Sequence, residues 1–145
     1  MVNAPQVIRE FLTTPGTAFY QAIGERVYFP YLPPNCENVA ACIAFSFQGG
    51  MPEVGGAIVN PDVEIWCYGG GSSTAAWRDP NAAWTCYMAL CDRLMTNGQA
   101  LQRTFTPHGI ILSAVQESEG VLINDPRIEW PGVQSVWSFE VTGRT

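Results

Sequence analysis

The sequence contains no lysine, and charged residues of either sign are scarce. Asp, Glu and Arg together make up 14% of the 145 residues, whereas globular proteins average about 25%. The formal net charge is −6, which argues against gripping a nucleic-acid backbone, because that requires a basic stripe. Two explanations fit so little charge. Part of the surface contacts other protein molecules, as oligomer interfaces are poor in charge at their centres, or one domain buries an unusually large share of itself. We favour the first.

Motifs for nucleotides, membranes and export are also missing. The stretch "CYGGGSSTAAWRDP" at 67–80 lies between a strand-like and a helix-like segment, where a phosphate-binding loop would sit. A P-loop needs a lysine, and the dinucleotide pattern G-x-G-x-x-G is absent. We therefore interpret the stretch as a loop that orders against a partner. No apolar run approaches the roughly 20 residues of a membrane helix, and no basic-then-apolar start indicates a signal peptide.

Catalytic and metal-binding groups are sparse. The odd number of cysteines, the lack of a CxxC pair and their apolar surroundings predict reduced core thiols of a cytoplasmic protein. His108 is the only histidine, so a Cys–His nucleophile is the less favoured reading and a metal site lacks ligands. Glu117 and Glu119 share a strand face that we expect to be solvated. We expect no catalytic residue, no cofactor and no metal. The cysteines are Cys36, Cys42, Cys67, Cys86 and Cys91.

Three segments predict helices. The first is "APQVIREFLTT", in which Pro5 begins a run of apolar residues at helical spacing. The second, "TAFYQAIG", predicts a turn or short helix that stops at Gly24. The main helix is expected over 80–97, with Asp79 as its cap and Gly98 as its stop.

Alternating apolar residues predict the strands. "RVYFPYLPP" indicates a short strand that Pro30 confines to a sheet edge, and the two long strands that follow should form a hairpin. The second of them should bend at Asn60–Pro61. The sequence thus predicts one α+β domain over 1–145: a mainly antiparallel sheet or sandwich of about five strands, with one long helix packed on it and a short N-terminal helix. The long strands are expected at 39–48, 57–69, 109–123 and 133–143.

Several segments, in order, resemble one protein family. "VIREFLTTPGTAFYQAIGERVYFPYLPP" has a helix, a short turn and an "RVY" that leads to a proline-rich exit. "NPDVEIWCYG" is similar to a central strand, "NAAWTCYMALCDRLM" to the helix after it, and "GIILSAVQESEGVLINDPRIEWPGVQSVWSFEV" to a closing pair of strands. On these segments the whole chain resembles the tail-terminator, or tail-completion, proteins of long-tailed bacteriophages. The long glycine-serine linker and the missing lysine depart from that pattern.

The resemblance implies a virion structural protein rather than an enzyme. Members form a ring, usually a hexamer, at the head-proximal end of the tail tube, where it ends tube polymerisation and joins the tail to the head. The implied partners are other copies of the chain, the tail-tube protein and the head–tail connector or neck proteins. DNA would pass through an acidic lumen without specific binding, and no membrane is involved. The implied location is the head–tail interface of the virion, after assembly in the host bacterial cytoplasm.

Assembly contacts are expected in two glycine-bounded loops and one turn, although each could equally be an ordinary solvated loop. Exposed ion pairs between subunits, from Arg78, Arg93 or Arg127 to Glu53, Asp62 or Glu129, would contribute at most about 1 kcal/mol each. The expected contact residues are Met51, Pro52, Glu53 and Val54 at a hairpin tip, Ser72, Ser73, Thr74, Trp77 and Arg78 in the second loop, and Asp125, Arg127, Glu129 and Trp130 in the turn.

Other functions remain open at this stage. The nearest is another neck or tail-tube structural protein: a stopper, an adaptor or the tube subunit itself. A small enzyme that uses a thiol and His108 is a second alternative. A third is a ligand-binding sandwich with a pocket lined by Trp66, Trp84 and Trp137.

Overall fold

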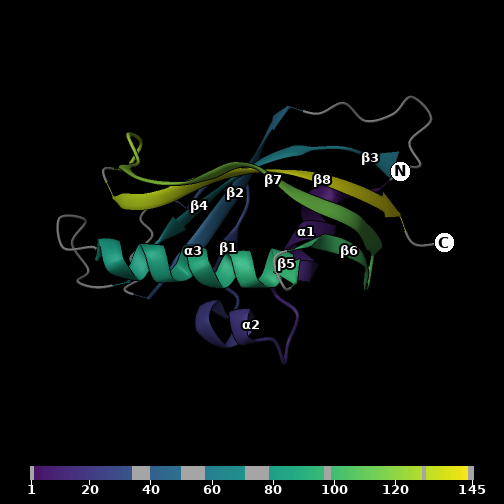
Figure 1. Cartoon of the computed structure of the whole chain (residues 1–145), viewed down its shortest axis with the longest axis horizontal. Helices are drawn as coiled ribbons and strands as arrows, with labels where there is room; N and C mark the ends of the chain where they lie inside the picture. The colour runs from purple at the N-terminus through teal and green to yellow at the C-terminus, as the bar shows by residue number, and fades with distance from the viewer. Residues whose placement is uncertain are drawn as a thin grey trace.

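One curved sheet with three helices makes up the described part of the chain. The computed structural model describes residues 2–33, 40–49, 58–70, 79–96, 99–128 and 130–143. The helices are α1 (Ala4–Leu12), α2 (Ala18–Ile23) and α3 (Pro80–Leu94). The strands are β1 (Val27–Tyr28), β2 (Cys42–Gly49), β3 (Ile58–Val59), β4 (Asp62–Tyr68), β5 (Met95–Thr96), β6 (Gln99–Thr106), β7 (Gly109–Asn124) and β8 (Pro131–Gly143). The strand order is β1-β2-β4-β8-β7-β6-β5, with β3 paired to β8 off this path. The predicted α+β class is confirmed (Figure 1).

The finer prediction of the sheet needs three corrections. The sheet is mixed, because β1 pairs with β2 in parallel while the other pairs are antiparallel. It is a single sheet of eight described strands curled into a half-barrel, rather than a sandwich of about five. The third correction is that α3 is not especially long: it ends at Leu94, because Met95 turns to extended backbone at φ −130° and ψ 125°.

The predicted hairpins are present, and two strand assignments differ. β2 pairs antiparallel with β4, and β7 with β8. The expected strand at 57–69 is two strands, because the break at Asn60–Pro61 separates β3, which pairs only with β8, from β4, which lies between β2 and β8. Sequence analysis missed β6 altogether, since "QALQRTFT" does not alternate cleanly between apolar and polar residues. Its pairing with β7 makes it a strand.

Local signals explain where the helices begin and end. The side chain of Asn3 caps α1 by accepting the Gln6 N–H at 3.2 Å, and Thr17 caps α2 in the same way. Asp79 caps α3 by accepting the Asn81 N–H at 2.9 Å. Gly24 ends α2 at φ +62°, a left-handed conformation that glycine tolerates without strain.

The core lies between the helices and one face of the sheet. Alternate strand residues point to opposite faces, and those on the helix side include Ile65 of β4 and Trp137 of β8, both fully buried. All three helices contribute to this core (Figure 1). A second, smaller cluster covers the opposite face. Its members are Cys42, Ala44, Trp66, Tyr68 and Trp130, with Tyr28, Leu32 and Ile128 packed against them.

Candidate interaction surfaces

Most of the predicted contact residues lie outside the part of the chain that the structure describes. Three of them, Asp125, Arg127 and Trp130, are described and belong to the turn between β7 and β8. Those outside the described residues are Met51, Pro52, Glu53, Val54, Ser72, Ser73, Thr74, Trp77, Arg78 and Glu129.

The turn after β7 is built around a buried carboxylate. Asp125 is 1% exposed. It accepts hydrogen bonds from the Tyr68 hydroxyl at 2.5 Å and from the backbone N–H of Arg127 at 2.9 Å, and the Arg127 Nε lies 3.4 Å away. Its own N–H donates to the Trp130 carbonyl at 2.8 Å. The turn is therefore held down onto β4 by polar contacts within one chain.

Aromatic stacking completes this arrangement on the outer face of the sheet. The rings of Trp66 and Tyr68 are stacked with centroids 6.0 Å apart, and Trp130 meets Tyr68 edge-on at 5.9 Å. The Arg127 guanidinium lies 4.2 Å above the Tyr31 ring. Asp125 and Trp130 are thus committed to packing inside the chain, and of the described contact candidates only Arg127 reaches the surface.

The two residues that contact the Asp125 carboxylate, Tyr68 and Arg127, have shifted pKa values. Burial, followed by the hydrogen bond to the Asp125 carboxylate, raises the pKa of Tyr68 well above its usual range. Burial lowers the pKa of Arg127, but the neighbouring Asp125 carboxylate outweighs it and the net direction is upward. Within the chain, Arg127 pairs with Asp125, and an ion pair from Arg127 to another subunit stays a prediction.

Arg93 is also used inside the chain. Its guanidinium lies 3.7 Å above the Phe11 ring and donates from Nη2 to the Phe11 carbonyl at 3.0 Å. Burial lowers the pKa of Arg93. The side chain joins α3 to α1, and its expected pairing with an acid of another subunit stays a prediction.

The described thiols and the histidine do not form a nucleophilic pair. Burial raises the pKa of Cys67 and of Cys91, which keeps both as unreactive thiols at neutral pH. The His108 ring lies at the surface and pairs through Nδ1 with the carboxylate of Glu10 on α1, with Gln6 beside it. Among the described residues, no three His, Cys, Asp or Glu side chains gather as metal ligands.

The suggested tryptophan pocket is wrong, because its three residues lie in different places. Trp66 belongs to the cluster on the outer face of the sheet, and Trp137 is fully buried on the helix side. Trp84 is on α3 and is 43% exposed.

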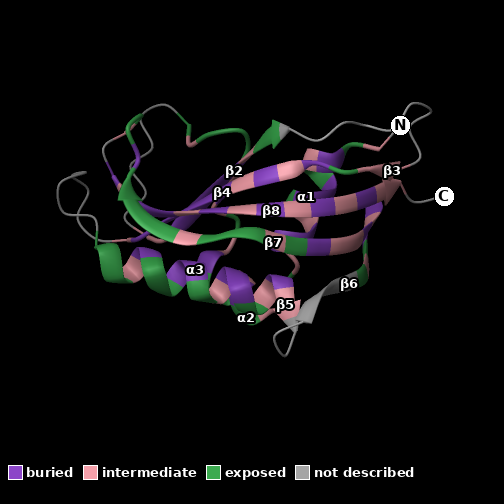
Figure 2. Cartoon of the chain, turned by 45° about the horizontal axis from the view of Figure 1, so that its top comes forward, coloured by how far each residue is buried: buried purple, intermediate pink, exposed green. Residues whose placement is uncertain are grey.

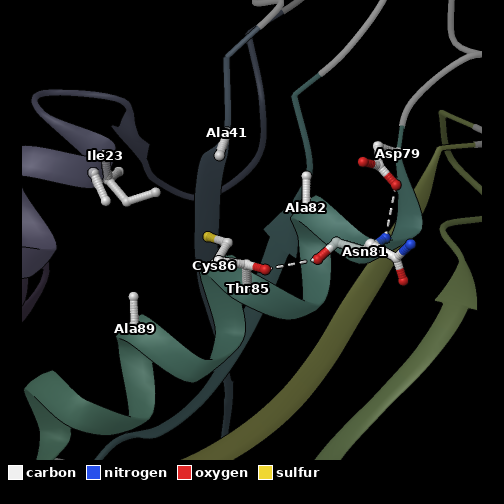
Figure 3. Close-up of a pocket in the computed structure, with 9 residues that line it drawn as sticks. Ile23, Ala41, Asp79, Asn81, Ala82, Thr85, Cys86 and Ala89 are labelled. Atoms are coloured by element: carbon white, nitrogen blue, oxygen red, sulfur yellow. Dashed lines mark hydrogen bonds between the residues drawn. The ribbon is translucent and has the colours of Figure 1, made fainter.

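A shallow groove of about 400 Å³ lies between α2 and α3 (Figure 3). Small apolar side chains line it, among them Ala41, Ala82 and Ala89. Its polar atoms are already engaged, since Asp79 caps the helix and the Thr85 hydroxyl donates to the Asn81 carbonyl at 3.0 Å. Specific ligand sites need polar groups that converge on the ligand, and these groups face their own helix.

The outer half of β7 is an open sheet edge. β6 pairs with β7 only as far as Ala114. From 115 to 124, β7 has β8 on one side, and no described strand pairs with the other. Apolar side chains are exposed along this segment: Val115 at 48%, Val121 at 52%, Leu122 at 45% and Ile123 at 41%. Figure 2 shows this half of β7 largely in the colour of exposed residues. We call residues 115–124 the β7 edge.

The opposite side of the sheet has a second open edge. β1 pairs with β2 only at Ile43 and Ala44. From 45 to 49, β2 has β4 on one side, and the described residues place no strand on the other. Phe47 is 37% exposed, and the ring of Phe29, itself 41% exposed, lies 5.3 Å from it. We call residues 45–49 the β2 edge.

Sequence analysis missed both edges as candidate surfaces. It assigned the contacts to loops, because openness is a property of strand order that periodicity does not reveal. One feature of the sequence could have indicated the β7 edge. Three consecutive apolar residues, Val121 to Ile123, follow Glu117 and Glu119 in the same strand, and all five are exposed.

Comparison with known proteins finds neither a family model nor a curated protein that matches the chain. None of the helices in the described segments is long and apolar enough to span a bilayer. The basis for a function is therefore the geometry of the two edges, together with the sequence resemblance.

Proposed function

We propose that the chain is a tail terminator: a structural subunit that forms a ring at the head-proximal end of a bacteriophage tail tube. The observation that carries the proposal is the single sheet with an apolar open edge on each side. Proteins protect exposed strand edges with charged side chains, proline, bulges or a covering segment. This chain has no lysine, the β2 edge has no charge, and the β7 edge has only Glu117, Glu119 and register shifts to protect it. A neighbouring subunit would cover both edges.

Two different edges on one subunit suit a ring. A contact between unlike surfaces generates a ring when the rotation closes and a filament when it does not. In the proposed assembly, usually a hexamer in the family that the sequence resembles, the ring ends tube growth on one face and meets neck proteins on the other. The net charge of −6 suits a lumen that repels rather than grips passing DNA. No catalytic step and no cofactor belong to this proposal.

Electron microscopy of the purified chain, alone and mixed with tail tubes, tests the proposal. We expect single rings, or one cap at one end of each tube. Tubes incubated without the chain are the control and should keep bare ends. Continuous tubes formed by the chain itself would make it a tube subunit. An absence of both rings and tube binding would contradict a structural role in the tail.

A further inference from the structure

We propose that neighbouring copies join edge to edge, with the β7 edge of one copy pairing antiparallel to the β2 edge of the next. The pairing gives each open edge a partner on a neighbouring copy, and it depends on the ring proposed above. Backbone hydrogen bonds would extend the sheet across the subunit boundary, as in other cases of strand addition.

Strand direction permits this continuation. β2, β4, β8 and β7 are neighbours in that order, and each step between them is antiparallel. Three such steps leave β2 and β7 running in opposite directions. A rotation about an axis along the strands therefore brings the β2 edge of one copy beside the β7 edge of another in antiparallel orientation, without turning either copy over.

The two edges also lie at the same height across the sheet. Phe47 on β2 is opposite Val63 on β4, which is opposite Trp137 on β8, which is opposite Gln116 on β7. Further along, Gly49 lies in the same row as Val115. The open part of β2 therefore shares rows with the first residues of the β7 edge, Val115 to Ser118, and neither edge needs a large shift to meet the other there.

Apolar side chains are exposed on both edges in these rows. Val115 is 48% exposed on the β7 edge, and Phe47 with its neighbour Phe29 is exposed beside the β2 edge. Val121 and Ile123 lie further along, in the rows of Ala44 and Cys42. Pairing would remove Val115, Phe47 and Phe29 from water, which is favourable in proportion to the apolar area covered.

The charges on the edges favour pairing of β7 with β2 over pairing of β7 with a second β7. The β7 edge carries Glu117 and Glu119, both exposed. A two-fold pairing of β7 with β7 would place two carboxylates from each copy on one ribbon, and like charges across strands are destabilising. The β2 edge, "FSFQG", has no charged residue. A β7–β2 contact avoids the repulsion and leaves one edge of each kind free to continue the ring.

Two single variants test the pairing. Val115→Lys places a charge on the β7 edge opposite the open part of β2, and Phe47→Lys places one on the β2 edge. We expect each variant alone to lose the rings and sediment as a monomer. An equimolar mixture should form a 1:1 dimer and nothing larger, because only one intact β7 edge and one intact β2 edge remain. Native mass spectrometry measures the stoichiometry. Ala22→Lys, an exposed change on α2, is the matched control and should keep the rings.

Three outcomes overturn the pairing, and a fourth separates it from the terminator role. A dimer of Phe47→Lys alone would show that β7 pairs with itself, and a dimer of Val115→Lys alone would show that β2 does. A wild-type chain that stays monomeric both alone and with tail tubes also overturns it. Circular dichroism establishes that the variants fold, and Ser118→Lys, in the row of Ser46, replaces Val115→Lys if that variant does not. Rings that resist both changes would leave a terminator role intact but reject these edges. Edge-dependent rings that never cap a tube would retain the edges and reject the terminator role.

Discussion

The Asp125 carboxylate holds the β7–β8 turn against the sheet through the hydroxyl of Tyr68 and the backbone of Arg127. It is almost fully buried, so its charge depends on these donors for the solvation that water no longer supplies. Losing one partner leaves a buried acceptor unsatisfied, which costs more than an average hydrogen bond contributes.

We expect Tyr68→Phe to lower the free energy of unfolding by about 1–3 kcal/mol, because it removes one donor from the buried carboxylate and keeps the ring stacking. Urea unfolding followed by tryptophan fluorescence measures the change. Tyr31→Phe, at a side chain that is 55% exposed, is the control and should stay within about 0.5 kcal/mol of wild type. Equal losses in the two variants would contradict a role for the Tyr68 hydroxyl.

Alkaline pH should destabilise the fold partly through Tyr68. Its folded-state pKa is raised by burial and by the hydrogen bond to Asp125, so its contribution is complete below the unfolded pKa of about 10 and is lost as the pH rises above it. Unfolding free energies of wild type and Tyr68→Phe, measured on either side of that pH, should show a shallower decline in the variant. The buried thiols contribute equally to both proteins. Parallel curves would reject this assignment.

Glu10 should make the stability of the fold depend on pH in the acidic range. Burial raises its pKa, but hydrogen bonds from His108 outweigh burial and the net direction is downward. Its stabilising contribution is present above its unfolded pKa and is lost as the pH falls through the lower folded value. Between about pH 5 and pH 3 we expect wild type to lose more stability than Glu10→Gln. Glu119→Gln, an exposed change on β7, should follow wild type; identical behaviour of all three would refute the link.

Among the strands, β7 depends on a glycine where it passes under α3. The Gly120 N–H donates to the Tyr87 hydroxyl at 2.9 Å. A Cβ at this position would lie 2.5 Å from the Tyr87 ring and 2.7 Å from the Val133 side chain. The register of β7 against β8 also shifts between Ser118 and Val121. The close approach of helix and strand therefore requires a residue without a side chain.

Gly120→Ala should destabilise the chain by about 1–3 kcal/mol, the usual cost of overpacking a filled site. Thermal unfolding followed by circular dichroism measures the loss. Ser118→Ala, an exposed position two residues earlier, is the matched control and should leave the unfolding temperature nearly unchanged. A tolerated Gly120→Ala would mean that α3 can move away from β7.

Assembly of the whole molecule should depend little on salt. If the proposed rings form through apolar edges in a chain with few charges, raising NaCl from about 0.05 M to about 0.5 M should leave the sedimentation coefficient of the ring unchanged or slightly favour the ring. Disassembly at the higher salt would instead point to ion pairs between subunits, such as those first expected for Arg78 and Glu53.

Much of the local structure was predictable from the sequence. The capping residue Asp79 identified α3, and the helical spacing of apolar residues identified α1. Alternation of apolar and polar residues identified β2, β7 and β8. These signals could be read because they act between residues close in the chain. The weak pattern of β6 was missed, since its pairing with β7 outweighs its intrinsic preference. The contact residues were predicted less well: Asp125 and Trp130 lie in the turn between β7 and β8, as expected, but both are buried.

The sequence by itself determined an α+β domain with few charges, no lysine to protect a strand edge, and thiols suited to a core. Only the tertiary structure decided that β1 joins in parallel, that the pairing of β6 with β7 ends at Ala114 of β7, and that, among the described strands, β2 and β7 have unpaired edges at one height. The reason is physical. Periodicity reports which side of a strand is buried, whereas strand order depends on contacts between distant segments, and an edge is open only where no such contact forms.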